Sequence, residues 1–272
     1  MGNENEITSL QNPRVKALVK LRDQRGRRAA GLFVAEGRRE VERAIAAGLR
    51  VQSVWVCEEL LGALGLPISN ETEVVAVPAA VFRKIAYVRE PEGVLAVCEP
   101  PAWSIDALTS AGTSTLDFVA VGTEKPGNLG AMVRTADSAG CRCVLSAGTA
   151  VDAMNPNAIR ASTAAVFTMP TVSLSEAEAI DYLVQQKIRV IAAVVDGEVE
   201  HDQADYTGAC AVVIGPEDRG LSEPWRVAAE QTGGATVRIA MAGRSVDSLN
   251  ASVAAGVLLF EAVRQRRAAG LQ

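Results

Sequence analysis

Three segments of the chain join turn-forming glycines to polar side chains that bind ligands, and each follows a predicted strand. The first spans 122–136. Gly127 and Gly130 let the backbone turn sharply, and Asn128 between them can cap a new helix. Arg134 comes six residues later on that helix. A capped helix start beside an arginine suits a phosphate, and the alternative is a turn, a cap and a surface arginine.

The second segment spans 212–223, where an apolar strand runs into Gly215-Pro-Glu217. Backbone groups and a carboxylate in a constrained loop could bind an adenine edge or a ribose. Alternatively, Glu217 is an ordinary loop acid and Ser222 caps the next helix.

The third segment spans 238–256 and passes through a glycine-containing loop to Ser248, a second candidate cap. The helix after it begins with small residues, which allow another backbone to approach closely. Its apolar stripe indicates core packing or a dimer face. The stripe consists of Leu249, Val253, Val257, Phe260 and Val263.

Other chemistries find little support in the sequence. It contains neither a GxxxxGK[ST] nor a GxGxxG phosphate-binding motif. The single histidine, His201, lies in a polar stretch typical of a surface loop, which disfavours a Ser-His-Asp hydrolase. The five cysteines are scattered without a CxxC pair, so we expect reduced thiols and no metal site.

The elements that must position the three segments alternate along the C-terminal part of the chain. We expect strands over 118–122, 142–146, 190–195, 211–215 and 236–240, and helices over 129–139, 175–186, 223–230 and 249–266. This alternation predicts a parallel sheet with helices on both faces. Ligands of such sheets bind at the carboxyl ends of the strands, where the three segments fall.

The N-terminal part predicts a smaller α/β domain. We expect helices over 38–47 and 79–87, and strands over 51–57, 74–77 and 93–98. A proline-led stretch and a small-polar stretch follow, as in an interdomain linker. We therefore predict a substrate-binding domain over 1–100, a linker over 101–115 and a second domain over 116–272.

The charge is unevenly distributed. The chain has a net charge of −5, which alone argues against a nucleic-acid partner, but residues 1–50 hold 11 Lys or Arg against 6 Asp or Glu. We expect an RNA-binding surface there, with a solvated helix face as the alternative. The candidate RNA contacts are Arg14, Arg25, Arg28, Arg38 and Arg39.

No apolar run reaches the roughly 18 residues of a membrane helix. The first residues also contain no apolar stretch typical of a secretion signal. We therefore expect a cytoplasmic protein without a membrane partner.

Taken in order, the three segments resemble the three motifs of the SpoU (TrmH-like) branch of the SPOUT methyltransferases over roughly 116–268. The third segment, with Ser-Leu-Asn-Ala-Ser-Val-Ala, is similar to the ribosomal RNA guanosine ribose methyltransferases. The N-terminal part resembles a small ribosomal-protein-like RNA-binding domain.

This resemblance implies transfer of a methyl group from S-adenosylmethionine to a ribose 2′-hydroxyl in RNA. Ribosomal RNA is the expected substrate, and transfer RNA is the alternative. It also implies a deep trefoil knot and a homodimer. Gly215, Glu217, Ile239 and Leu249 fall at positions that hold the cofactor in the family. The catalytic positions fall on Asn128, Arg134, Ser248 and Asn250, where Arg134 is expected to orient and stabilise charge because an arginine stays protonated.

Two departures concern the loops around the cofactor positions. Glu124-Lys125-Pro126 stands where many members have Asp-Pro, and Ala240 replaces a common proline. The alternative function is a non-catalytic RNA-binding or ribosome-assembly protein, and base methylation is disfavoured by the Ser-Leu-Asn segment. Both a housekeeping modification and resistance to a ribosome-binding antibiotic fit the same residues.

Overall fold

The computed structural model describes residues 6–62, 65–69, 71–108, 112–149, 151–243, 245 and 248–271. Contacts divide the chain into two compact units. The first comprises Met1–Ala102 with Asp152–Thr168, and the second Trp103–Val151 with Met169–Gln272. The segment Asp152–Thr168 thus packs with the N-terminal residues, although it lies between elements of the second unit in the sequence.

The first unit is built on a four-stranded sheet in the order β1-β4-β2-β3. The strands are β1 (Phe33–Glu36), β2 (Val51–Val56), β3 (Glu73–Ala76) and β4 (Val94–Cys98). β4 pairs antiparallel with β1 and β2, whereas β3 pairs parallel with β2. The helices are α1 (Pro13–Lys20), α2 (Gln24–Ala30), α3 (Arg38–Ala46), α4 (Glu58–Leu61), α5 (Ala79–Ile85) and α7 (Pro156–Ala161), with a 3₁₀ turn at η2 (Ala165–Phe167). The core under α1 and α5 includes Trp55, Phe82 and Val15.

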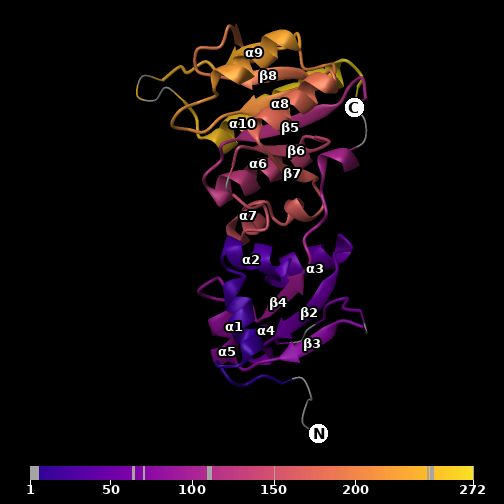
Figure 1. Ribbon diagram of the computed structural model, residues 1–272, viewed down its shortest axis with the longest axis vertical. Helices are drawn as coiled ribbons and strands as arrows, with labels where there is room; N and C mark the ends of the chain where they lie inside the picture. The colour runs from indigo at the N-terminus through magenta and orange to yellow at the C-terminus, as the bar shows by residue number, and fades with distance from the viewer. Residues whose placement is uncertain are drawn as a thin grey trace. The chain divides into compact units, whose positions relative to one another are not determined.

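The second unit contains an entirely parallel sheet of seven strands in the order β7-β6-β5-β10-β8-β11-β9. Figure 1 labels β5, β6, β7 and β8 of this sheet. The strands are β5 (Leu116–Val121), β6 (Val144–Ala147), β7 (Thr171–Leu174), β8 (Arg189–Ala193), β9 (Val199–Glu200), β10 (Cys210–Ile214) and β11 (Ala235–Arg238). The helices are α6 (Pro126–Ser138), α8 (Glu176–Gln185), α9 (Glu223–Gln231) and α10 (Ala251–Ala268), with a 3₁₀ turn at η1 (Ile105–Ala107).

Two pairs of helices cover this sheet. α8 and α9 pack against each other and against β6, β8 and β11, whereas α6 and α10 pack against each other and against β5 and β10. Alternate residues of the strands, such as Val119 and Val213, meet Leu183 and Trp225 in the core beneath α8 and α9. Both faces are therefore buried, which explains why β10 is apolar throughout and why β5 is apolar apart from Asp117.

The α/β class and the parallel sheet predicted for the C-terminal part are confirmed. One local expectation was wrong, and one group of elements was not predicted. The helix predicted from residue 129 begins at Pro126, so Gly127 and Asn128 lie in its first turn and Asn128 is not its cap. The chain between the predicted strand 142–146 and helix 175–186 contains α7, η2 and β7, which have no clear periodic signal in the sequence. The knot stays a prediction from the resemblance.

No helix in the described part of the chain is long and apolar enough to cross a membrane. The same residues contain no group of three His, Cys, Asp or Glu side chains placed to hold a metal ion. All five cysteines are buried free thiols, and burial raises the pKa of the Cys98 thiol to about 12.

Candidate active site

A cleft of about 410 Å³ opens in the second unit, where β8, β10 and β11 end. Its wall combines the loop after β10, the chain after β11 and the start of α10. Four predicted cofactor residues line it: Gly215, Glu217, Ile239 and Leu249. Ser248, predicted to be catalytic, lines it as well. Ligands bind at the carboxyl ends of parallel strands, so this cleft is the candidate active site.

The loop after β10 needs glycine at position 215. A Cβ there would lie 2.6 Å from the carbonyl carbon of Gly220 and 2.7 Å from the backbone nitrogen of Leu221. Gly220 itself has a φ of +64°, a conformation that other residues rarely adopt. The loop consequently folds back on itself and presents backbone groups beside Glu217.

Glu217 joins the three candidate segments. Its Oε1 accepts hydrogen bonds from Asn128 Nδ2 at 3.0 Å, from the backbone N–H of Ala251 at 3.3 Å, and from Asn250 Nδ2. Its Oε2 accepts one from Lys125 Nζ at 3.3 Å. The Ala251 N–H, followed by the Lys125 and Asn128 contacts, lowers the pKa of this carboxyl below its ordinary value of 4.5. Glu217 is therefore an anionic anchor and a poor general base near neutral pH.

The N-terminus of α10 is fixed by Asn250, not by Ser248. Asn250 is the cap, and its side-chain oxygen accepts the backbone N–H of Ser252 at 3.0 Å. The cap expectation for Ser248 was wrong, and Ser248 instead lies exposed at the cleft. One asparagine thus caps a helix and binds the Glu217 anchor at the same time.

The unusual Glu124-Lys125-Pro126 sequence has a structural role here. Lys125 forms an ion pair with Glu217 at 3.3 Å, and Glu124 lies 3.8 Å from Arg219. Both pairs connect the first segment to the loop after β10. In the sequence alone, these residues are only a departure from the family pattern.

Asp196 is a cleft residue that was not among the residues predicted from the sequence. It lines the wall beside Gly215 and forms an ion pair with Arg226 at 2.5 Å. The Arg226 hydrogen bond lowers the pKa of the Asp196 carboxyl. The available signal was its position directly after the predicted strand 190–195, where the ligand-binding edge of a parallel sheet lies.

Arg134 is exposed on α6 and is not among the cleft residues. It lies six residues beyond Asn128, about 9 Å further along the helix axis. The Glu217 contacts unite Asn128 and Asn250 at the cleft but do not include Arg134.

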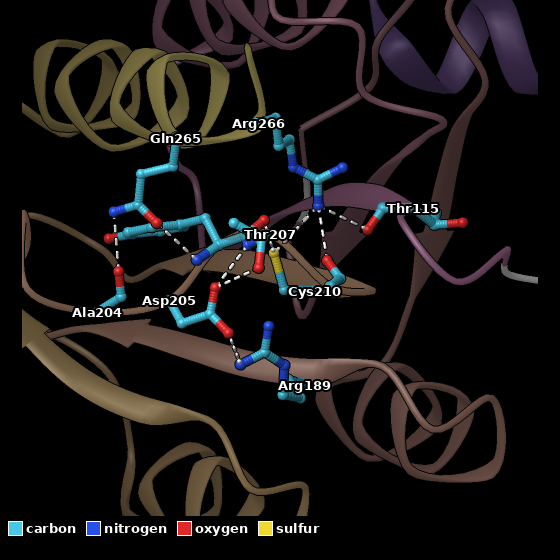
Figure 2. A network of polar contacts seen from close by, with 10 residues as sticks. Thr115, Arg189, Ala204, Asp205, Thr207, Cys210, Gln265 and Arg266 are labelled. Atoms are coloured by element: carbon cyan, nitrogen blue, oxygen red, sulfur yellow. Dashed lines mark hydrogen bonds and ion pairs between the residues drawn. The ribbon is translucent and has the colours of Figure 1, made fainter. Parts of the chain in front are cut away.

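The far end of α10 is anchored at the opposite ends of the strands (Figure 2). Arg266, almost fully buried, donates to the carbonyl oxygens of Thr115 at 3.1 Å and Gly208 at 2.7 Å, and contacts Cys210 Sγ at 3.6 Å. Gln265 donates to the Ala204 carbonyl at 2.9 Å. These contacts hold the helix whose first residues line the cleft.

The arginines predicted to bind RNA differ in their surroundings in the first unit. Arg14 pairs with Glu73 at 2.6 Å and lies over the Trp55 ring. Arg38 and Arg39 pair with Glu42 and Glu40 respectively. Arg25 and Arg28 are exposed on α2, and neither has an ion pair among the described residues.

Comparison with known proteins places both parts of the chain. Residues 115–260 match the SpoU rRNA Methylase family, and residues 12–96 match the MRM3-like substrate binding domain. The chain is 32% identical to a 23S rRNA (uridine(2479)-2′-O)-methyltransferase of Streptomyces viridochromogenes, over 92% of this chain and 88% of that protein. It is 33% identical to the 23S rRNA (guanosine-2′-O-)-methyltransferase RlmB of Ralstonia nicotianae, over 80% of this chain and 83% of that protein.

A solved structure is similar across both units. The crystal structure of the SpoU methyltransferase AviRb from Streptomyces viridochromogenes, in complex with the cofactor AdoMet, superposes with a TM-score of 0.82. The match has 28% sequence identity and covers 94% of this chain and 99% of that one.

Proposed function

The chain belongs to the SpoU rRNA methylase family and is an S-adenosylmethionine-dependent RNA 2′-O-methyltransferase, and we propose that its substrate is the ribosomal RNA of the large subunit. Two relatives act on 23S rRNA, one on a uridine and one on a guanosine, which supports this substrate over transfer RNA. The observation that carries the assignment is the Glu217 network, because it assembles the three candidate segments around one cleft.

The cleft fits S-adenosylmethionine. Gly215, Ile239 and Leu249 line it, and Leu221 and Val237 add apolar wall against which an adenine can pack. The carboxylates of Glu217 and Asp196 suit the ribose hydroxyls and the positive charge of the cofactor. When bound, the cofactor supplies an electrophilic methyl group on its sulfonium.

The catalytic roles follow from what each side chain can do. Arg134 offers a planar cationic group with several N–H donors, so it orients the target phosphate and stabilises developing negative charge on the ribose oxygen. Asn128 and Asn250 hold Glu217 and thereby fix the cofactor loops. Ser248, at the cleft, is placed to position the hydroxyl that attacks.

We assign RNA binding to the first unit, with Arg25 and Arg28 as its principal phosphate contacts. Residues 1–100 form the RNA-binding domain, 101–115 the linker and 116–272 the methyltransferase domain, whose segment 152–168 packs with the first unit. The match of residues 12–96 to a substrate binding domain supports this division.

The working form is a homodimer in the cytoplasm. Val253 and Phe260 on α10 are half exposed, at 51% and 50%, which supports an apolar face that a second copy covers. A dimer also allows Arg134 of one subunit to serve a cleft of the other, which accounts for its distance from the Glu217 network.

Methyl transfer from labelled S-adenosylmethionine to unmodified 23S rRNA tests these roles with Arg134→Ala. We expect a loss of about a hundredfold to a thousandfold in kcat with nearly unchanged cofactor affinity, since one electrostatic contact to the transition state is removed. Arg264→Ala, which removes another exposed arginine of the second unit, is the matched control and should retain activity. Wild-type turnover by Arg134→Ala would exclude the assigned role.

A further inference from the structure

The turn after α5 holds an exposed aromatic side chain in a rigid setting. Tyr87 is 40% exposed, which makes it one of the few large hydrophobic side chains of the first unit that face solvent. Its position is fixed by polar side chains from three segments that are distant in the sequence.

Two of these side chains hold the backbone of the turn. Arg22 donates to the carbonyl oxygens of Lys84, at 2.8 Å, and Ala86. Glu36 accepts the backbone N–H of Tyr87 at 2.7 Å and that of Val88 at 3.3 Å. The backbone donors and acceptors on both sides of Tyr87 are therefore satisfied by side chains that lie in the turn after α1 and in β1.

The third side chain fixes the ring. Asn157 of α7 donates from Nδ2 to the Tyr87 hydroxyl at 2.9 Å. α7 is itself held in this unit, because Asp152 pairs with the buried Arg27 at 2.7 Å and Arg43 donates to the Thr163 carbonyl. The segment 152–168 thus restrains the outer end of an aromatic ring whose turn is already fixed.

Cationic side chains lie near this turn. Arg160, exposed on α7, and Arg22 are both close enough to Glu36 to oppose the rise in the pKa of its carboxyl that burial causes. Arg89 is exposed two residues after Tyr87. Proteins bind unpaired nucleotides with an exposed aromatic ring, on which the base stacks, and with nearby cations, which contact the phosphates.

We infer that Tyr87 is a stacking platform for an unpaired base of the RNA substrate, and that Arg160 contacts the adjacent phosphate. The inference rests on the proposed function and names the RNA feature that the first unit recognises: a single-stranded nucleotide of the substrate. A rigid aromatic loses little conformational entropy on binding, so the contacts that fix the turn favour affinity.

Affinity measurements on the full chain test the platform, with a single-stranded RNA and a blunt duplex of equal phosphate number as probes. Tyr87→Ala should weaken single-strand binding about fivefold to a hundredfold and leave the salt dependence unchanged, because stacking releases no counterions. Duplex binding should change little. Arg160→Ala should instead reduce the slope of log affinity against log salt by about one.

Two further variants separate stacking from a structural role. Tyr87→Phe keeps the ring and loses only the Asn157 hydrogen bond, so it should bind single-stranded RNA within about threefold of wild type. Tyr87→Leu keeps apolar bulk without a flat ring and should bind as poorly as Tyr87→Ala. Equal single-strand affinity of wild type and a folded Tyr87→Ala would overturn the inference, as would a loss in Tyr87→Phe as large as in Tyr87→Ala.

Methyl transfer to 23S rRNA by the wild type is measured in parallel. If the wild type transfers methyl groups while Tyr87→Ala binds RNA normally, the platform is wrong and the proposed function stands. If the wild type transfers none, the proposed function fails, and the binding data still decide the platform.

Discussion

The cleft of the second unit and the basic helices of the first unit both gather charged side chains, but by different routes. In the cleft, side chains from two segments distant in the sequence converge on Glu217, which lies in a third. In the first unit, arginines that are close in sequence diverge. Arg27 is 4% exposed and pairs with Asp152, whereas Arg25 and Arg28 on the same helix face solvent.

This difference between the two units shows which sequence patterns predict a functional site. A parallel sheet brings the carboxyl ends of its strands to one edge, so polar residues after separate strands meet there whatever their distance along the chain. A cluster of arginines on short helices has no such constraint. The face of the helix on which an arginine lies determines its partner. Some arginines of the cluster therefore form structural ion pairs, whereas others stay accessible to solvent.

Removing the anchor of the cleft should have the largest effect. Glu217→Ala deletes the acceptor of four donors and should lower methyl transfer by about a thousandfold, with weaker cofactor binding in calorimetry. Lys125→Ala removes one exposed contact of the same carboxylate and should cost less than about tenfold. Equal methyl transfer by the two variants would show that the contacts of Glu217 do not contribute to activity.

A second test concerns the ion pair that holds the inserted segment in the first unit. Asp152→Ala leaves the buried Arg27 guanidinium without its carboxylate and should destabilise this unit by about 3 kcal/mol in chemical denaturation of the full chain. Replacing both partners with apolar residues, Arg27→Met with Asp152→Leu, should recover part of the loss. An unchanged denaturation midpoint in Asp152→Ala would show that the segment does not depend on this pair.

The smallest expected effect distinguishes accessible from paired arginines. Arg25→Ala combined with Arg28→Ala should weaken binding to 23S rRNA and reduce its salt slope by about two, one for each phosphate contact. Arg14→Ala combined with Arg39→Ala removes the same charge from side chains already paired with carboxylates, and should change the slope by less. A larger change in the salt slope for the Arg14 and Arg39 variant than for the Arg25 and Arg28 variant would show that the paired arginines are the main RNA contacts.

Much of the second unit follows from the sequence because most of its strands are short and largely apolar, and most are separated by helices. The residues 215, 217, 239, 248 and 249 were all predicted, and the structure brings them to one cleft. The convergence of Lys125 and Asn250 on Glu217 could not be predicted, since a contact across 92 residues has no local signal. The packing of 152–168 with the first unit lacked a signal for the same reason, because its ion pair joins residues 125 apart.

The position of the transferred methyl group tests the central claim most directly. Wild-type protein is incubated with labelled S-adenosylmethionine and unmodified 23S rRNA, and the RNA is digested with nuclease P1 and separated by mass spectrometry. The cleft and its family predict label in one 2′-O-methylated nucleoside. Label in a base-methylated nucleoside, or none in the RNA while the cofactor binds the cleft, would contradict this account.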